Sequence, residues 1–172
     1  MSHRLNATQL TVQYNGRNRM PDELGAVAWD SHGRKFRFVK SASVNTAGDV
    51  LGITSTATTA GAQGRGWRAS RTASARNSRG AVGVAIAALS SSMYGWVQCA
   101  GPLGTFGTLT TKMKTDKSVV AGDDVIKDQT TAAMGDTAVA TGSQSGMIVG
   151  YALGSDSGSF LVAGTLIDRF AT

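Results

Sequence analysis

Cysteine is almost absent from this chain of 172 residues, since Cys99 is its single cysteine. One cysteine excludes an internal disulfide framework and any zinc site built from several cysteines. We interpret Cys99 as a small buried apolar residue. The chain also lacks an apolar run long enough to span a bilayer, and the start, MSHRLNATQL, lacks the apolar core of a signal peptide. We therefore expect a protein that is made in a cytoplasm and does not contact a membrane.

Acidic residues are missing from one long part of the chain, because none occurs between Leu51 and Thr115. Residues 1–115 carry 14 basic and 4 acidic side chains, a balance of +10, whereas residues 116–172 carry 3 basic and 7 acidic, a balance of −4. A basic half and an acidic half suggest association with an acidic partner or with copies of the same chain. A simple solvated surface is the alternative explanation.

Proline occurs twice and aromatic residues make up 6% of the sequence, whereas glycine occurs 22 times. Frequent Gly, Ser and Thr between short alternating segments indicate short strands and turns rather than long helices. The predicted strands are 10–14, 25–30, 34–40, 46–53, 81–89, 93–101, 119–127, 136–142, 146–153 and 159–167. About ten short strands at close spacing predict a single all-β domain, a compact sandwich or barrel of short antiparallel strands, over residues 1–172.

The segment 54–80 differs in composition from the rest of the chain. It consists of Ser, Thr, Ala, Gly and Arg with one large apolar residue, Trp67, so it cannot bury enough surface to hold itself in place. We interpret it as an extended arm or long loop that becomes ordered against a partner. Its candidate partner-binding residues are Arg65, Trp67, Arg68, Arg71, Arg76 and Arg79. Such a set fits single-stranded nucleic acid by charge and stacking, or an acidic protein surface by bidentate contacts, and composition does not choose between them.

The stretch MYGWVQCAG, residues 93–101, has the alternation of a strand. Met93, Val97 and Cys99 point to one face and suit a core, whereas Tyr94 and Trp96 point to the other. A large amphipathic face of this kind suits the edge of a core or a contact between subunits. We take Tyr94 and Trp96 as candidates for an oligomer interface.

Two short internal similarities suggest a chain built from similar hairpins. TAGDV (46–50) resembles VAGDDV (120–125), and VGVA from residue 82 with CAG ending at 101 resembles VGYA from 149 with VAG ending at 164. These matches are too short to establish a repeat on their own.

Residues that could carry chemistry do not occur in catalytic patterns. His32 stands in a predicted turn and His3 near the start of the chain, so neither forms a pair with Cys99. GSQSG (142–146) and GSDSG (154–158) lack the central serine of a nucleophile elbow. The acidic residues Asp116, Asp123, Asp124 and Asp128 do not have the spacing of a calcium loop. We therefore expect no enzyme activity, no metal, no cofactor and no small-molecule substrate.

Four segments together carry a family resemblance: LGAVAWDSHGRKFRFVKSASVNTAGDVLG (24–52), VGVAIAALSSSMYGWVQCAG (82–101), AGDDVIK (121–127) and GMIVGYALGSDSGSFLVAGTLI (146–167). They resemble the auxiliary capsid proteins of tailed bacteriophages, which are also called decoration or cement proteins. The similarity covers most of the chain outside residues 54–80, and it rests on strand and glycine-turn patterns. No binding residue of that family is transferred to a position of this chain.

The resemblance implies a β-rich structural protein on the outer surface of a virion. Its partners would be the major capsid protein and itself, commonly as a homotrimer, and it would stabilise contacts between capsid subunits. The alternative from the residues themselves is a basic nucleic-acid-binding β-barrel domain, for which the arm and the strand RKFRFVK (34–40) are partial matches. If the chain is a capsid protein, binding of nucleic acid is not expected.

Overall fold

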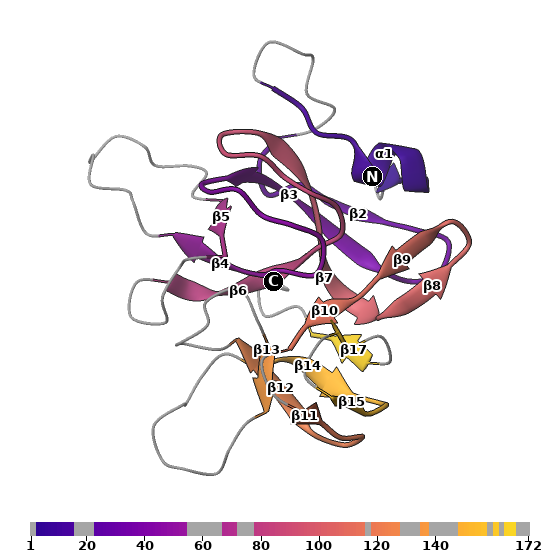
Figure 1. The fold of residues 1–172 in the computed structure, drawn as a ribbon. Coiled ribbons are helices and arrows are strands. Elements are labelled where there is room, and N and C mark those ends of the chain that lie inside the picture. The colour runs from indigo at the N-terminus through magenta and orange to yellow at the C-terminus, as the bar shows by residue number, and fades with distance from the viewer. Residues whose placement is uncertain are drawn as a thin grey trace.

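Strands form nearly all of the regular structure in the computed structural model, together with one short helix (Figure 1). The all-β prediction is therefore confirmed. The structure describes residues 3–15, 23–54, 67–71, 78–115, 118–127, 135–137, 148–157, 160–161 and 164–167.

A closed barrel of five strands is the centre of the fold. Its members are β3 (Lys35–Ser41), β4 (Val50–Thr54), β5 (Arg68–Ser70), β6 (Ser78–Ala85) and β7 (Tyr94–Pro102). The strand order is β3-β5-β4-β6-β7, and β7 pairs with β3 to close the cylinder. The β3–β5 pair is parallel and the other four pairs are antiparallel. Closure leaves no free edge among these strands.

Outer elements extend the barrel on the side of β3. Strands β1 (His3–Arg4) and β2 (Val27–Trp29) continue the sheet beyond β3, and β2 and β3 form the predicted hairpin. The helix α1 (Ala7–Thr11) follows β1, and the hairpin of β8 (Gly104–Phe106) and β9 (Leu109–Thr111) follows β7.

The C-terminal strands form a second group below the barrel in the view of Figure 1. They are β10 (Met113–Lys114), β11 (Ser118–Val119), β12 (Asp124–Lys127), β13 (Gly135–Thr137), β14 (Ile148–Ala152), β15 (Asp156–Ser157), β16 (Phe160–Leu161) and β17 (Gly164–Leu166). We call β3–β7 the first unit and β10–β17 the second unit. The units are joined directly, because β17 pairs with the end of β7.

Four strands of each unit have the same arrangement, which the short sequence similarities only suggested. In the first unit the strand order is β5-β4-β6-β7, and in the second it is β13-β12-β14-β17. Strands β5, β4, β6 and β7 are therefore equivalent to β13, β12, β14 and β17. Leu51 pairs with Gly83 in the first unit as Val125 pairs with Gly150 in the second, and the register shifts directly after each of these pairs. The isolated bridge Asn45–Leu89 corresponds to the pair of Val119 with Asp156.

The turns that begin β4 and β12 are equivalent down to their hydrogen bonds. In the first, the N–H of Thr46 donates to Oδ2 of Asp49 (2.7 Å), and the N–H of Gly48 donates to the carbonyl of Ala85 (2.7 Å). In the second, the same two bonds join Val120 to Asp123 (3.0 Å) and Gly122 to Ala152 (2.8 Å). Aspartate suits this position because its side chain caps the backbone of its own turn.

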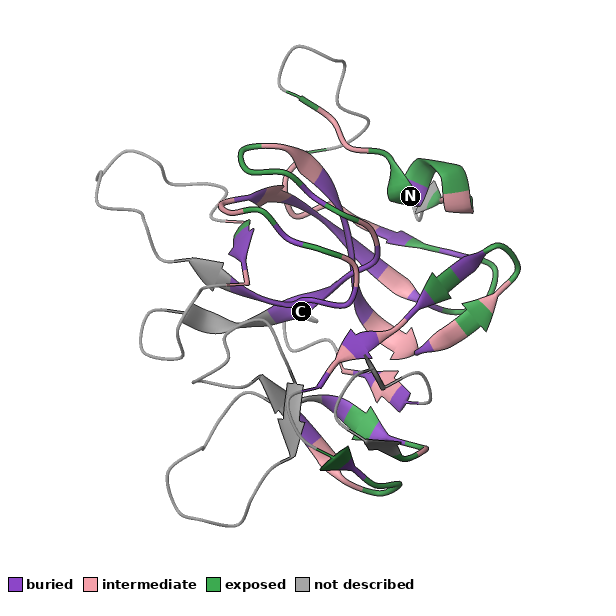
Figure 2. Cartoon of the chain, in the orientation of Figure 1, coloured by how far each residue is buried: buried purple, intermediate pink, exposed green. Residues whose placement is uncertain are grey.

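Three clusters of buried apolar side chains hold the fold together. The interior of the barrel contains Val39, Leu51, Ala69, Val82, Ala85, Leu89 and Val97. The aromatic cluster under α1 and β2 contains Leu10, Ala28, Phe36, Phe38, Ile86, Trp96 and Leu109. The third cluster is shared by both units and contains Val50, Val84, Leu103, Met113, Val119, Val125, Ala152 and Leu166. Figure 2 shows this burial along the barrel strands.

One predicted strand is wrong, because residues 10–14 begin within α1 instead of forming a strand. The side chain of Asn6 accepts a hydrogen bond from the N–H of Gln9 (2.9 Å), and the N–H of Asn6 donates to Oε1 of Gln9 (3.0 Å). This capping box starts a helix locally, and the apolar alternation of Leu10, Val12 and Tyr14 does not outweigh it.

Part of the predicted arm belongs to the barrel. Residues 68–70 form β5, which pairs with both β3 and β4 and is needed to close the cylinder. Thr54 ends β4 and residues 78–80 begin β6. The remaining parts, 55–66 and 72–77, lie outside the described residues, where an arm or long loop stays a prediction.

Candidate partner-binding surfaces

Trp67, the one large apolar residue of the predicted arm, packs into the fold. It is half-buried against the barrel interior, and the guanidinium of Arg37 stacks on its ring at 4.3 Å from the centroid. Arg37 also donates to the carbonyl of Gly25 (3.3 Å). A Cβ at Gly25 would lie 2.1 Å from Nε1 of Trp67, so only glycine fits against this ring. Trp67 therefore anchors β5, and a role in binding a partner stays a prediction.

The predicted arginines are not gathered into one described cluster. Arg68 is exposed on β5, next to Lys40 of β3 in the parallel register. Arg71 is half-buried, and its N–H donates to Oδ1 of Asn45 (3.0 Å). Arg79 lies on β6, where the backbone is described, and Arg65 and Arg76 lie outside the described residues. Their role in partner binding is untested.

Tyr94 and Trp96 lie on the same face of β7, as predicted, but they differ in exposure. Trp96 is 3% exposed and packs on Phe38, with ring centroids 5.1 Å apart. Tyr94 is half-buried and stacks on Phe38 with ring centroids 6.3 Å apart, and Nζ of Lys40 lies 5.1 Å from the Tyr94 ring. In the single chain Trp96 is a core residue, because α1 and β2 cover it. Their assignment to an oligomer interface stays a prediction.

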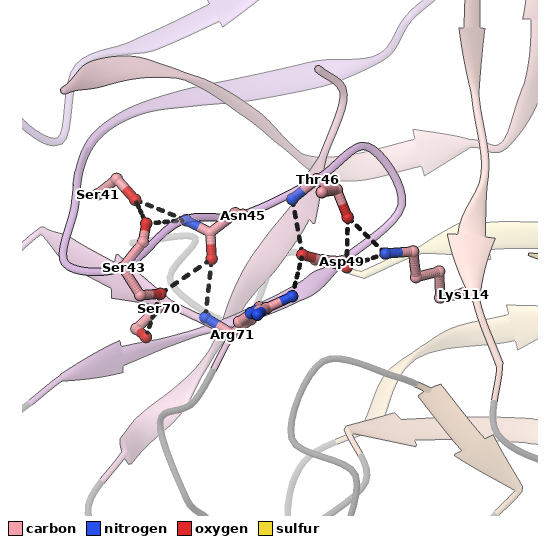
Figure 3. A network of polar contacts seen from close by, with 8 residues as sticks. All are labelled: Ser41, Ser43, Asn45, Thr46, Asp49, Ser70, Arg71 and Lys114. Carbon is pink, nitrogen blue, oxygen red and sulfur yellow. Dashed lines mark hydrogen bonds and ion pairs between the residues drawn. The ribbon is translucent and has the colours of Figure 1, made fainter. Parts of the chain in front are cut away.

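A polar network joins the first unit to β10 of the second unit (Figure 3). The carboxylate of Asp49 is fully buried, and Nζ of Lys114 donates to its Oδ1 at 2.5 Å. The guanidinium of Arg71 lies 3.9 Å from Oδ2. The amide of Asn45, also fully buried, donates to Oγ of Ser41 (2.6 Å). These polar groups stabilise the fold, because a buried charge or amide requires hydrogen-bond partners inside the protein.

A second buried ion pair fixes the β2–β3 turn. Nε of Arg34, which is 2% exposed, donates to Oδ2 of Asp30 (2.6 Å), and its guanidinium lies 4.9 Å from the ring of Phe106. Burial acts to raise the pKa of the Asp30 carboxyl. Hydrogen bonds from the Arg34 side chain and from the N–H groups of Arg34 and His32 together outweigh burial and lower that pKa below its ordinary value.

The residues with reactive side chains are placed apart from one another. Cys99 is buried with its Sγ 3.4 Å from the carbonyl of Lys35. His32 lies on the exposed turn, with Nδ1 3.7 Å from Oδ2 of Asp30. Within the described ranges, no three His, Cys, Asp or Glu side chains are grouped closely enough to hold a metal ion. The same ranges contain no helix that is long and apolar enough to cross a membrane.

Three large exposed apolar side chains lie on the described part of the second unit. Val120 is 56%, Tyr151 42% and Leu153 66% exposed. The turn that carries Val120 is bonded to β14 through Ala152, between Tyr151 and Leu153. Asp124 pairs with Tyr151 across β12 and β14. We call Val120, Asp124, Tyr151 and Leu153 the acidic-apolar patch, and such a patch is typical of a binding surface.

A row of basic and aromatic side chains lies on β3 of the first unit and on the outer strands β1 and β2 beside it. Arg4 pairs with Trp29, and Trp29 pairs with Lys35, across β1, β2 and β3. The three side chains therefore share one face of the sheet. Trp29 is 37% exposed and Nζ of Lys35 lies 5.6 Å from its ring. We call Arg4, Trp29 and Lys35 the basic row.

Comparison with known proteins gives a weak structural likeness. No protein-family model and no curated protein sequence matches this chain. The fold is similar to the crystal structure of the N base of head fiber gp8.5 in bacteriophage phi29. The TM-score is 0.44 and the sequence identity 13%, over 78% of this chain and 93% of that chain. At these values the likeness establishes neither a shared family nor a shared function.

The sequence did not point to either surface described above. Tyr151, Leu153 and Trp29 lie in segments whose alternation correctly predicts strands. Alternation alone does not show which side of a strand a second sheet covers. The basic row also requires the register of three strands, one of them parallel, which no local pattern encodes.

Proposed function

We propose that this chain is a structural virion protein. It binds the outer capsid shell of a tailed bacteriophage, contacts the major capsid protein and stabilises the contacts between capsid subunits. It also associates with itself, as a homotrimer, and has no catalytic role. It is made in the host cytoplasm and resides on the outer surface of the virion.

The observation that carries this proposal is the position in the fold of the four segments that resemble auxiliary capsid proteins. Residues 24–52, 82–101, 121–127 and 146–167 supply the hairpin, the barrel strands and the turns of both units. The buried polar groups described above in these segments are hydrogen-bonded within the fold, and Trp29, Tyr151 and Leu153 are exposed on its surface. This is what an auxiliary shell protein requires. The likeness to the phi29 head fiber base also concerns a phage head protein, but at a TM-score of 0.44 it carries no part of the proposal.

Binding to the shell should involve Arg68 and the other arginines of the predicted arm. Arg68 is exposed on β5, and the sequence segments on either side of this strand, 55–66 and 72–77, carry Arg65 and Arg76. Exposed charge contacts of this kind weaken as salt screens them over roughly 8–10 Å. Arg71 is a poorer test residue, because it also faces Asp49.

The test is co-sedimentation with shells that lack the protein. We expect the wild-type chain to sediment with shells, and the double variant Arg65→Ala/Arg68→Ala to bind at least tenfold more weakly with an unchanged melting temperature. The double variant Arg17→Ala/Arg19→Ala removes the same charge elsewhere and should bind like the wild type. Failure of the wild-type chain to bind the shell of the particle from which it comes would refute the proposal.

The alternative function is a basic nucleic-acid-binding β-barrel domain. The observation that favours it is a row across three barrel strands, in which Lys40 of β3 pairs with Arg68 of β5 on one side and with Tyr94 of β7 on the other. Single strands bind such groups by charge and stacking. A gel shift at physiological salt separates the two functions, and we expect no binding at protein concentrations in the low micromolar range.

A further inference from the structure

The repeated architecture shows which face of the second unit is left uncovered. Val50 pairs with Val84 in the first unit, and the equivalent pair in the second is Asp124 with Tyr151. Both valines are fully buried, because apolar side chains of the second unit cover them in the shared cluster. The equivalent face of the second unit has no covering element among the described residues, and Tyr151 is 42% exposed.

Leu153, which directly follows β14, repeats this contrast. Ile86 is 7% exposed in the aromatic cluster, whereas its equivalent Leu153 is 66% exposed. In stacked repeats the outermost unit ordinarily presents a polar face, because no neighbour covers it. Here the outer face combines a tyrosine, a leucine and a valine with a carboxylate. That composition suits burial against a further surface rather than permanent contact with water.

The basic row has the complementary chemistry. It offers a half-exposed tryptophan between two cations, while the acidic-apolar patch offers Asp124 beside Tyr151 and Leu153. Arg4 and Asp124 form no ion pair within the described part of the chain. Trp, Tyr and Arg are the residues in which interface energy concentrates, and pairing opposite charges selects the partner and the orientation.

We propose that the acidic-apolar patch of one copy docks onto the basic row of a second copy. The inference rests on the self-association included in the proposed function and names the two surfaces that make it. The contact is heterologous, because it joins two different surfaces. Repetition of a heterologous contact produces a closed ring when the rotation closes. Each copy in the ring then uses both surfaces once.

Sedimentation velocity of the isolated protein tests this arrangement without shells. The wild-type chain should sediment as an oligomer at tens of micromolar. Asp124→Lys and Arg4→Glu should each raise the dissociation constant at least tenfold, because each places like charges across the contact. Lys40→Glu makes the same charge change as Arg4→Glu outside both surfaces, so it should assemble like the wild type. Melting temperatures should agree among all four proteins at a concentration low enough that each is monomeric, because assembly itself stabilises the folded state.

A charge-swapped chain gives the decisive measurement. In the double variant Asp124→Lys/Arg4→Glu, the altered patch of each copy meets the altered row of the next copy, so opposite charges face each other at every contact of the ring. The double variant should therefore assemble like the wild type, whereas each single variant stays monomeric. A wild-type monomer, unimpaired assembly of Asp124→Lys, or a double variant that stays monomeric would each overturn the proposal. A wild-type monomer combined with loss of shell binding by Asp124→Lys would assign the patch to the shell instead.

Discussion

Alanine at three glycines separates two physical effects in this fold. Gly33 has a φ of +77° and no atom within 4 Å of the place that a Cβ would occupy, so Gly33→Ala introduces backbone strain alone. Gly150 has no positive φ, but its Cβ would lie 2.1 Å from the carbonyl oxygen of Thr165. Gly83 combines both effects, with a φ of +148° and a Cβ 2.2 Å from the carbonyl oxygen of Gln98.

The expected losses in the free energy of unfolding follow from these distances. A Cβ in the left-handed region costs about 1–2 kcal/mol, which is the effect expected for Gly33→Ala. Overpacking against a backbone atom costs roughly 1–3 kcal/mol, and no side-chain rotation relieves it, so this is expected for Gly150→Ala. Gly83→Ala should lose about 2–5 kcal/mol, the two effects together. That is a large part of the roughly 5–15 kcal/mol of a typical domain.

Urea unfolding measures all three variants. Tryptophan fluorescence reports on the first unit and its outer strands, because the chain's three tryptophans are Trp29, Trp67 and Trp96, and far-UV circular dichroism reports on all strands. The two transitions should coincide in every variant, since the units share one apolar cluster. A Gly83→Ala protein no less stable than Gly33→Ala would refute the close approach of β6 and β7 and, with it, the equivalence of the units.

Three further changes test the buried polar groups and the thiol. Asp30→Asn should lose about 3 kcal/mol at pH 7 in urea unfolding, because Arg34 stays buried without its counter-charge. The folded-state pKa of Asp30 is lowered, so its contribution is complete above the unfolded pKa of about 3.9 and is lost as pH falls through the folded value. The variant's stability should thus vary less with pH below about 4, and an unchanged acid dependence would contradict this. Lys114→Met should lose roughly 2–3 kcal/mol, less than a fully broken pair because Arg71 still faces Asp49, and a neutral result would show that the pair adds nothing. Cys99 should react with a thiol reagent only after unfolding, and rapid reaction of the native protein would contradict its burial.

Local patterns predicted the strands well where alternation and burial coincide. In β7 the alternation of Trp96 and Val97 separates two different cores, as a strand between two apolar layers requires. Barrel closure was not predictable from segment 54–80. Its strand β5 is held by Arg37 and Gly25, which contact Trp67 from far away in the sequence, and composition alone cannot show such contacts.

The similarity between the two units was also only partly predictable from local sequence patterns. The turns at Asp49 and Asp123 were found, because a capping aspartate after glycine is a local signal. The final strands were matched wrongly, since the sequence pairs CAG with VAG, whereas the structure makes Cys99 equivalent to Leu166. The equivalence of β7 and β17 depends on how closely their backbones approach Gly83 and Gly150, and not on similar residues in the two sequences. The candidate surfaces were missed for a related reason. The exposure of Tyr151 depends on which elements of the folded chain pack against β14, and the local sequence does not show this.

Two copies of one architecture ordinarily suggest modules that could be separated or exchanged, but the shared cluster prevents this here. A chain cut after Pro102 would lose Val125, Ala152 and Leu166, which cover Val50 and Val84 of the first unit. It would also lose Lys114, the closest cation to the buried carboxylate of Asp49. The first half is therefore an incomplete protein rather than a smaller one, and changes that preserve the fold must preserve both halves together.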